Sequence, residues 1–209
     1  MTTAHAHPNI ALVKYWGKQD KPGNLPATPN LSITLAGLTT VTHVEDAEAD
    51  QFELNGRSSQ DPKLQRWLSS LREVFDVPPL GISSSNDFPT SAGLASSASG
   101  FAALITAINA HCELGLNEEM RSEWARMGSA SAARSIFGGF VALVPPQWQA
   151  LRLARSEHWP LEVVVAVTSN EAKSVSSGEG MERSRLTSPY YKAWLRDAAT
   201  DFAAGSQAI

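Results

Sequence analysis

The sequence has a single cysteine, Cys112, and no long hydrophobic run. One thiol cannot form an internal disulfide, which excludes a disulfide-stapled scaffold and favours a reducing compartment. The longest apolar run, residues 161–167, is interrupted by Glu162 and is too short to cross a bilayer. Residues 1–8 contain no apolar segment of the kind found in signal peptides. We therefore expect a soluble, cytoplasmic protein without a membrane partner, in which Cys112 is a buried structural residue rather than a reactive thiol.

Positive charge is also scarce. The 209 residues include 17 Lys and Arg against 21 Asp and Glu, a formal net charge of −4, with no basic block anywhere. This distribution argues against a nucleic-acid partner. No spacing of His, Cys and Asp suggests zinc, and no Ser-His-Asp arrangement suggests nucleophilic catalysis, so metal ligands stay unassigned. A hydrophobic content of 43% is nevertheless ample for a core.

The order of strand and helix patterns predicts an α+β fold. Strands are expected at residues 9–16, 31–35, 39–44, 52–56, 81–86, 139–144 and 161–168. Helices are expected at residues 61–75, at 92–111, from 117 with a buried stripe, and at 190–202. That stripe comprises Met120, Trp124 and Met127. We expect a connection between lobes at Pro145-Pro146 and a polar loop at 171–189, and we place an N-terminal lobe at 1–157 and the beginning of a C-terminal lobe at 158–209.

Small and hydroxyl residues gather directly before the helix expected at 92–111. They include Ser91, Gly93, Ser96 and Ser97, and an apolar face with helical spacing begins at Leu94. Free N–H groups and the positive end of the dipole make a helix start an anion site. We interpret the segment as a phosphate-binding loop whose ligand is a nucleotide. The alternative is a small-residue turn that only lets the helix pack tightly on a sheet.

A second small-residue segment, residues 128–135, adds an arginine to the same kind of helix start. Arg134 follows Ser129 and Ser131, and its planar fork matches a carboxylate or a phosphate. The alternative is a salt bridge at the surface or between domains.

Two further polar segments could contact an anion. The sequence Lys14-Tyr15-Trp16-Gly17-Lys18 offers ammonium and phenol groups to a phosphorylated substrate, and we expect Gly17 to bend the chain and aim Lys18 away from Lys14. The alternative is an edge strand protected by lysines. Residues 174–180 are either a flexible surface loop or a lid that supplies hydroxyls.

Three of these segments together resemble the diphosphomevalonate decarboxylases of the GHMP kinase superfamily. They are residues 8–18, 88–98 and 128–135, and the Gly180-Met181 and Thr187-Ser188-Pro189 motifs strengthen the likeness, which runs through nearly the whole chain. The Lys-Tyr-Trp-Gly-Lys motif is highly specific, whereas related kinases share the outline of the loop but usually carry Gly where Ala95 stands. The resemblance implies a two-lobe fold, with an N-terminal lobe like domain 2 of ribosomal protein S5 and the start of a ferredoxin-like C-terminal lobe.

The resemblance also implies a reaction. ATP, with Mg²⁺, phosphorylates the 3-hydroxyl of mevalonate 5-diphosphate, and loss of phosphate and CO₂ gives isopentenyl diphosphate in the mevalonate pathway of isoprenoid biosynthesis. Relatives commonly form homodimers. The alternatives are a related small-molecule kinase acting on mevalonate or phosphomevalonate, and a catalytically incomplete ligand-binding fragment.

Site residues carry over by position. The resemblance implies Lys18, Arg134 and Asn9 as the catalytic set, with Asn9 orienting Arg134 and Arg134 holding the substrate carboxylate. It implies that the remaining substrate contacts are Tyr15, Ser129, Ser131 and Ser177. It places the ATP phosphates at Ser91, Gly93, Leu94, Ala95, Ser96 and Ser97.

Two departures from the family pattern matter. Gly178 stands where some relatives carry Arg, so another cation must act there or the diphosphate is held more loosely. The catalytic Asp of the family lies in a C-terminal Asp-Ala-Gly-Pro-Asn-like segment, and nothing in this sequence matches it. We therefore expect the sequence to be a fragment, a truncated product, or one of two polypeptides that assemble.

Overall fold

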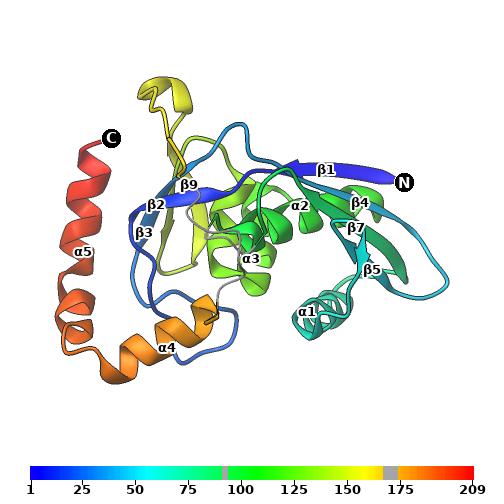
Figure 1. Cartoon of the computed structure of the whole chain (residues 1–209), viewed down its shortest axis with the longest axis horizontal. Coiled ribbons are helices and arrows are strands. Elements are labelled where there is room, and N and C mark those ends of the chain that lie inside the picture. Colours follow the sequence, from blue (N-terminus) through cyan, green and yellow to red (C-terminus); the bar gives the residue numbers. More distant parts are fainter. Residues whose placement is uncertain (91–93, 167–173) are drawn as a thin grey trace.

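The computed structural model describes residues 1–90, 94–166 and 174–209, whose strands form two sheets (Figure 1). The first sheet has the order β1-β4-β7-β5-β6 and is antiparallel except where β5 runs parallel to β7. These strands are β1 (Thr2–Ala6), β4 (Thr40–Asp46), β5 (Gln51–Leu54), β6 (Arg57–Ser58) and β7 (Leu80–Asn86). The second sheet is antiparallel, with the order β2 (Asn9–Val13), β3 (Asn30–Thr34), β8 (Phe140–Val144) and β9 (Gln149–Ala154).

Helices lie against both sheets, and together they confirm the α+β class. The α-helices are α1 (Pro62–Arg72), α2 (Ser96–His111), α3 (Glu118–Gly128), α4 (Ser177–Thr187) and α5 (Tyr191–Gln207), and the 3₁₀ helices are η1 (Ala130–Ile136) and η2 (Ser156–His158). In Figure 1, α2 and α3 occupy the centre of the molecule, while α4 and α5 lie at the side of β2 and β3. No helix of the described residues is both long and apolar enough to cross a membrane.

Side-chain caps fix the helix starts that the sequence predicts. Asp61 accepts a hydrogen bond from the Lys63 N–H at 2.8 Å, with Pro62 in the first turn, and Asn117 caps α3 through the Met120 N–H at 2.8 Å. Each such cap stabilises a helix by about 1 kcal/mol. α1 then buries one face, comprising Leu64, Trp67, Leu68 and Leu71. It ends at Arg72 rather than at residue 75, and Val74 is exposed.

The main core lies between α2 and the first sheet. Ile105 and Ile108 of α2 are fully buried together with Val44 and Leu80 of the sheet. Complete burial of such side chains contributes about 1.5–3 kcal/mol each. Helix α2 also contacts α3 and η1, which in turn contact β9 and β8 of the second sheet. The helix layer therefore joins the two sheets. This packing brings the start of α2 close to the end of α3.

Several predicted elements differ from the structure. Strand β2 ends at Val13 rather than at residue 16, and helix α2 begins at Ser96, after Ala95 in the left-handed region at φ +52°. Met120 is 41% exposed, so it does not belong to the buried stripe of α3. Trp124 and Met127 of the predicted stripe are partly buried against the core. The fully buried residues of α3 are Ser122, Ala125, Arg126 and Gly128.

The segment after residue 144 also differs. Pro145-Pro146 does not begin a connection between lobes, because β9 follows at once and pairs with β8 as a hairpin. Residues 161–166 form no strand, and Val164 is 93% exposed, because no neighbouring strand in the described part of the chain pairs with them. The polar loop expected at 171–189 contains helix α4, whose Ser176 and Glu179 form a capping box.

Candidate active site

A cleft of about 710 Å³ collects most of the residues that the sequence singles out. Its walls come from the segment after β2, the start of α1, the starts of α2 and η1, and the start of α4. The predicted residues that line it are Tyr15, Lys18, Ala95, Ser97, Ser129, Ser131, Arg134 and Ser177. Segments more than a hundred residues apart in the sequence thus meet at one opening.

Hydroxyl groups join the two small-residue segments across the cleft. The Oγ atoms of Ser97 and Ser129 lie 3.3 Å apart, and those of Ser129 and Ser131 lie 3.3 Å apart. The close approach requires glycine at 128, because a Cβ there would lie 2.1 Å from Cδ1 of Phe101. A chain of hydroxyls beside the N-terminus of α2 is suited to an anion.

The other residues predicted to bind the ATP phosphates, apart from Ala95 and Ser97, do not line the cleft or lie outside the described residues. Ser96 lines a neighbouring pocket rather than the cleft, and Leu94 lines neither. Ser91 and Gly93 lie outside the described residues.

Arg134 is a charged residue of the cleft whose side chain is held by several hydrogen bonds. It is fully buried, and its guanidinium donates to Ser32 Oγ at 2.8 Å, to Asn9 Oδ1 at 3.1 Å and to Asn30 Oδ1. Burial lowers its pKa to about 10, so it stays charged at neutral pH. A guanidinium has five N–H groups, which leaves donors for a ligand. Within residues 1–90, 94–166 and 174–209 it forms no ion pair.

Asn9 stands behind this arginine and ties it to η1. Its Nδ2 donates to Ser135 Oγ at 2.8 Å and to the Ser131 carbonyl at 3.0 Å. Its Oδ1 atom is thereby turned toward Arg134, as the prediction that Asn9 orients Arg134 requires. The nearby Tyr15 hydroxyl is buried and has no hydrogen-bond partner in the described part of the chain, and burial raises the pKa of this phenol. It therefore remains a protonated donor.

Among the described residues, three lysines line the cleft with their ammonium groups: Lys14, Lys18 and Lys63. Lys14 and Lys18 both face it, which corrects the expectation that Gly17 aims Lys18 elsewhere: β2 has already ended at Val13, so strand alternation no longer governs the two side chains. Strand β2 does lie at the edge of its sheet, as the edge-strand alternative requires, but both lysines lie beyond its end. Lys63, at the start of α1, was missed because nothing in its local sequence distinguishes it from a solvated helix lysine. Burial lowers the pKa of Lys18, and burial together with the charge of Lys18 lowers that of Lys63.

Helix α4 closes one side of the cleft. Ser177 lies in its first turn, and Trp16 Nε1 donates to Ser184 Oγ at 2.9 Å, which fastens the helix to the Lys14–Lys18 segment. Gly17 of that segment has no room for a side chain, because a Cβ there would lie 2.2 Å from the Tyr191 hydroxyl of α5. Residues 174–180, interpreted as either a flexible loop or a lid, include the first turn of the capped helix α4.

A smaller pocket of about 240 Å³ adjoins the cleft and shares Lys63 and Ser97 with it. Its walls combine apolar and aromatic side chains with hydroxyl and amide groups and the carboxylate of Asp61. The apolar residues are Phe52, Leu54, Leu64, Phe101 and Leu104, and the polar ones include Ser84, Asn86, Thr90 and Ser96. No sequence motif indicates this pocket, because its residues come from five separate elements: β4, β5, α1, β7 and α2.

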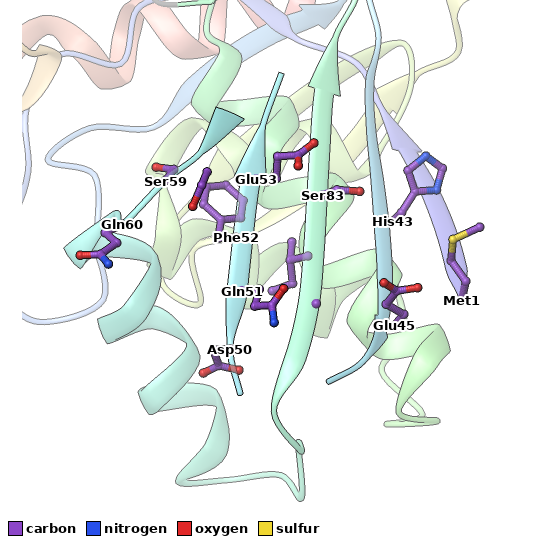
Figure 2. Close-up of a pocket in the computed structure, with 13 residues that line it drawn as sticks. Met1, His43, Glu45, Asp50, Gln51, Phe52, Glu53, Ser59, Gln60 and Ser83 are labelled. Atoms are coloured by element: carbon purple, nitrogen blue, oxygen red, sulfur yellow. The ribbon is translucent and has the colours of Figure 1, made fainter. Parts of the chain in front are cut away.

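A third hollow, shown in Figure 2, is lined by acidic side chains, whereas the first cleft is lined by lysines and Arg134. His43, Glu45 and Ser83 project into it from β4 and β7, and Glu53 from β5. No lysine or arginine is among its described lining residues. An anionic ligand therefore fits the first cleft and not this one. In the described part of the chain, no group of three or more His, Cys, Asp or Glu side chains could hold a metal ion.

Comparisons with known proteins point to one family. Residues 6–149 match the family described as "Diphosphomevalonate decarboxylase-like N-terminal domain". A diphosphomevalonate decarboxylase of Candida albicans is 43% identical over 88% of this chain. The structure described as MDDEF in complex with MVAPP, AMPPCP and magnesium superposes with a TM-score of 0.84 at 38% identity over 97% of this chain. The mevalonate diphosphate decarboxylase of Staphylococcus aureus gives 0.83 at 35% identity over 99% of this chain.

The match covers only part of each relative. The chain spans 58% of the Candida albicans protein, 65% of the chain in the MDDEF complex and 66% of the Staphylococcus aureus chain.

Proposed function

Because this chain belongs to the diphosphomevalonate decarboxylase family of the GHMP kinase superfamily, we propose that its cleft binds ATP and mevalonate 5-diphosphate for ATP-dependent decarboxylation to isopentenyl diphosphate. One observation carries the proposal: Lys18, Ser97 and Arg134 come from three distant segments and line a single cleft. This arrangement supplies separate sites for two phosphate groups and a carboxylate.

The ATP phosphates are assigned to the hydroxyl side of the cleft. Ser97 and Ser129 offer hydroxyls there, and Lys63 offers an ammonium at the boundary with the smaller pocket. That pocket, with Phe52 and Phe101 in its walls, is assigned to the nucleobase. No carboxylate lines the cleft within the described residues, so Mg²⁺ would be held through phosphate oxygens, hydroxyls and water, a ligand set that suits this cation. Mg²⁺ would neutralise phosphate charge during phosphoryl transfer.

The substrate diphosphate is assigned to the part of the cleft around Lys18, whose charge is close enough to Lys63 to lower the pKa of that lysine. Lys18 supplies charge, and the Tyr15 phenol, held protonated by burial, supplies a donor. Ser177 and the N-terminus of α4 face the same region. Gly178 carries no charge, and we assign the work of the missing arginine to Lys14, which lines the same wall.

Arg134 is assigned to the substrate carboxylate. Phosphoryl transfer converts the 3-hydroxyl, a poor leaving group, into a good one. As the C3–O bond breaks, C3 becomes cation-like, and the electron pair of the bond to the carboxylate forms the new double bond while CO₂ departs. A buried, three-fold hydrogen-bonded guanidinium holds the carboxylate in line for this step without reorganising.

Binding and turnover need separate measurements. We expect titration calorimetry to show that the purified chain binds an ATP analogue and mevalonate 5-diphosphate, with loss of the second in Arg134→Lys. A coupled assay that measures CO₂ and phosphate together distinguishes decarboxylation from the alternative kinase activity, which releases no CO₂. Failure of the chain to bind either ligand would contradict the proposal.

We also propose a cytoplasmic homodimer with a lobe boundary near residue 157. The support for the location is the lone Cys112, which is partly buried without a disulfide partner. Analytical ultracentrifugation tests the dimer, and limited proteolysis tests the boundary.

A further inference from the structure

The segment that carries Lys18 is a closed loop. The Ala27 N–H donates to the Gly17 carbonyl at 2.9 Å, the Gln19 N–H donates to the Leu25 carbonyl at 2.9 Å, and Lys18 and Pro26 form an isolated bridge. These contacts bring the two limbs of the loop together. As a result, Lys18 on one limb faces Asn24 on the other.

Asn24 uses both ends of its amide. Its Oδ1 accepts a hydrogen bond from Lys18 Nζ at 2.6 Å, and its Nδ2 donates to the Met127 carbonyl at 2.6 Å. Its backbone lies in the left-handed region at φ +53°, which asparagine tolerates better than most residues. The side chain also lines the cleft. One amide therefore bridges the ammonium of Lys18 and the last turn of α3.

The loop is anchored to α3 at a second point. The buried Arg126 side chain donates to the Gly23 carbonyl through Nη1. Gly23 has φ +90°, and a Cβ there would lie 3.2 Å from Arg126 Nη1, so the turn fits against the arginine without a side chain. Met127 precedes Gly128 and Ser129, which begin the second wall of the cleft. The anchor thus fixes the position of Asn24 relative to that wall.

We propose that Asn24 is a positioning residue that fixes the ammonium of Lys18 at the diphosphate end of the cleft. A free lysine side chain samples many rotamers, and ordering it costs up to about 2 kcal/mol. The Asn24 amide removes much of this freedom before a ligand arrives, which is preorganisation. The identity of the ligand rests on the function proposed above, whereas the contact between Asn24 and Lys18 does not.

The contact has an effect that can be measured without any ligand. A carbonyl oxygen that accepts from an ammonium stabilises its charged form, and here it opposes the burial that lowers the pKa of Lys18. Asn24→Gly keeps the left-handed backbone but removes the acceptor, so the pKa of Lys18 should fall. Asn24→Asp keeps an acceptor and adds negative charge, so the pKa of Lys18 should rise.

The experiment compares these two variants with the wild type and with Asn117→Gly. The control removes another asparagine with a local hydrogen bond, at the opposite end of α3. The first readout is the rate of Lys18 acetylation across pH, followed by mass spectrometry. The second is the affinity for inorganic pyrophosphate, measured by calorimetry. Circular dichroism melts establish that each variant folds.

At fixed pH we expect Asn24→Gly to be acetylated at Lys18 about three- to tenfold faster, Asn24→Asp to be acetylated more slowly, and both to bind pyrophosphate about tenfold more weakly. The control should match the wild type in both readouts. A Lys18 profile unchanged in both folded Asn24 variants would overturn the proposal. So would a shifted profile with unchanged pyrophosphate affinity. If the wild type binds no pyrophosphate, the assignment of the diphosphate site fails, and the acetylation profiles alone decide whether Asn24 fixes Lys18.

Discussion

Replacing Arg134 with methionine is expected to lower the free energy of unfolding by about 2–4 kcal/mol. Burial lowers the pKa of this arginine from 12.5 to about 10, which corresponds to about 3 kcal/mol against the charged form. Each of its three hydrogen bonds offsets about 1.5–3 kcal/mol, because the donor is charged. Methionine removes the charge and the donors together, leaving the oxygens of Asn9, Asn30 and Ser32 without them.

Urea and thermal denaturation measure this loss. In a chain of this size about 1 kcal/mol shifts the melting temperature by about 2–4 °C, so we expect a fall of about 5–15 °C. The matched control is Arg66→Met, because Arg66 is an exposed arginine on α1; it should change stability by no more than about 0.5 kcal/mol. Equal melting of the two variants would refute the reasoning, since it would mean that the buried network contributes no more than a surface side chain.

Three further substitutions test other parts of the structure. Gly128→Ala should destabilise the protein by about 1–3 kcal/mol in thermal denaturation, because the new Cβ would meet Phe101; an unchanged melting temperature would contradict this. The hydrogen bond from Arg72 lowers the pKa of Asp50 below 3.8. The contribution of Asp50 to the free energy of unfolding is therefore fully present above pH 3.8 and is lost as the pH falls through the lower pKa of the folded state. Asp50→Asn should make the free energy of unfolding, measured in urea, depend less on pH at acid pH. Ser97→Ala should weaken ATP binding about five- to tenfold in calorimetry with little change in melting; loss confined to the mevalonate ligand would show that the loop is wrongly assigned.

Elements with strong local signals are predictable from this sequence. Asp61-Pro62 and Asn117 start helices where the sequence places them, and the Asn55-Gly56 turn joins β5 and β6. Each depends on a few neighbouring atoms, such as a capping oxygen or a turn with positive φ. Strand β1 was missed because its residues are small or polar, and it is defined only by pairing with β4, about forty residues away.

In the candidate site, too, the parts with a local sequence signal are predictable and the parts defined by tertiary packing are not. The small-residue segments and the Lys14–Lys18 motif identify its walls, because their composition is unusual wherever they lie. Lys63 and the neighbouring pocket have no such composition, and their place is set by the contacts of Lys63 and Trp67 of α1 with Phe101 of α2. Helix α4 had a readable signal in Ser176 and Glu179, three residues apart, which the polar composition of the segment obscured.

The close approach of Tyr191 to Gly17 places helix α5 next to the candidate active site. The phenol of Tyr191 occupies the volume where a side chain at position 17 would begin, and the next residue is Lys18. A shift of α5 along its own axis would therefore displace the peptide unit that aims the lysine. A substitution that moves α5 is therefore expected to change the affinity for a ligand at Lys18, even where α5 does not contact that ligand.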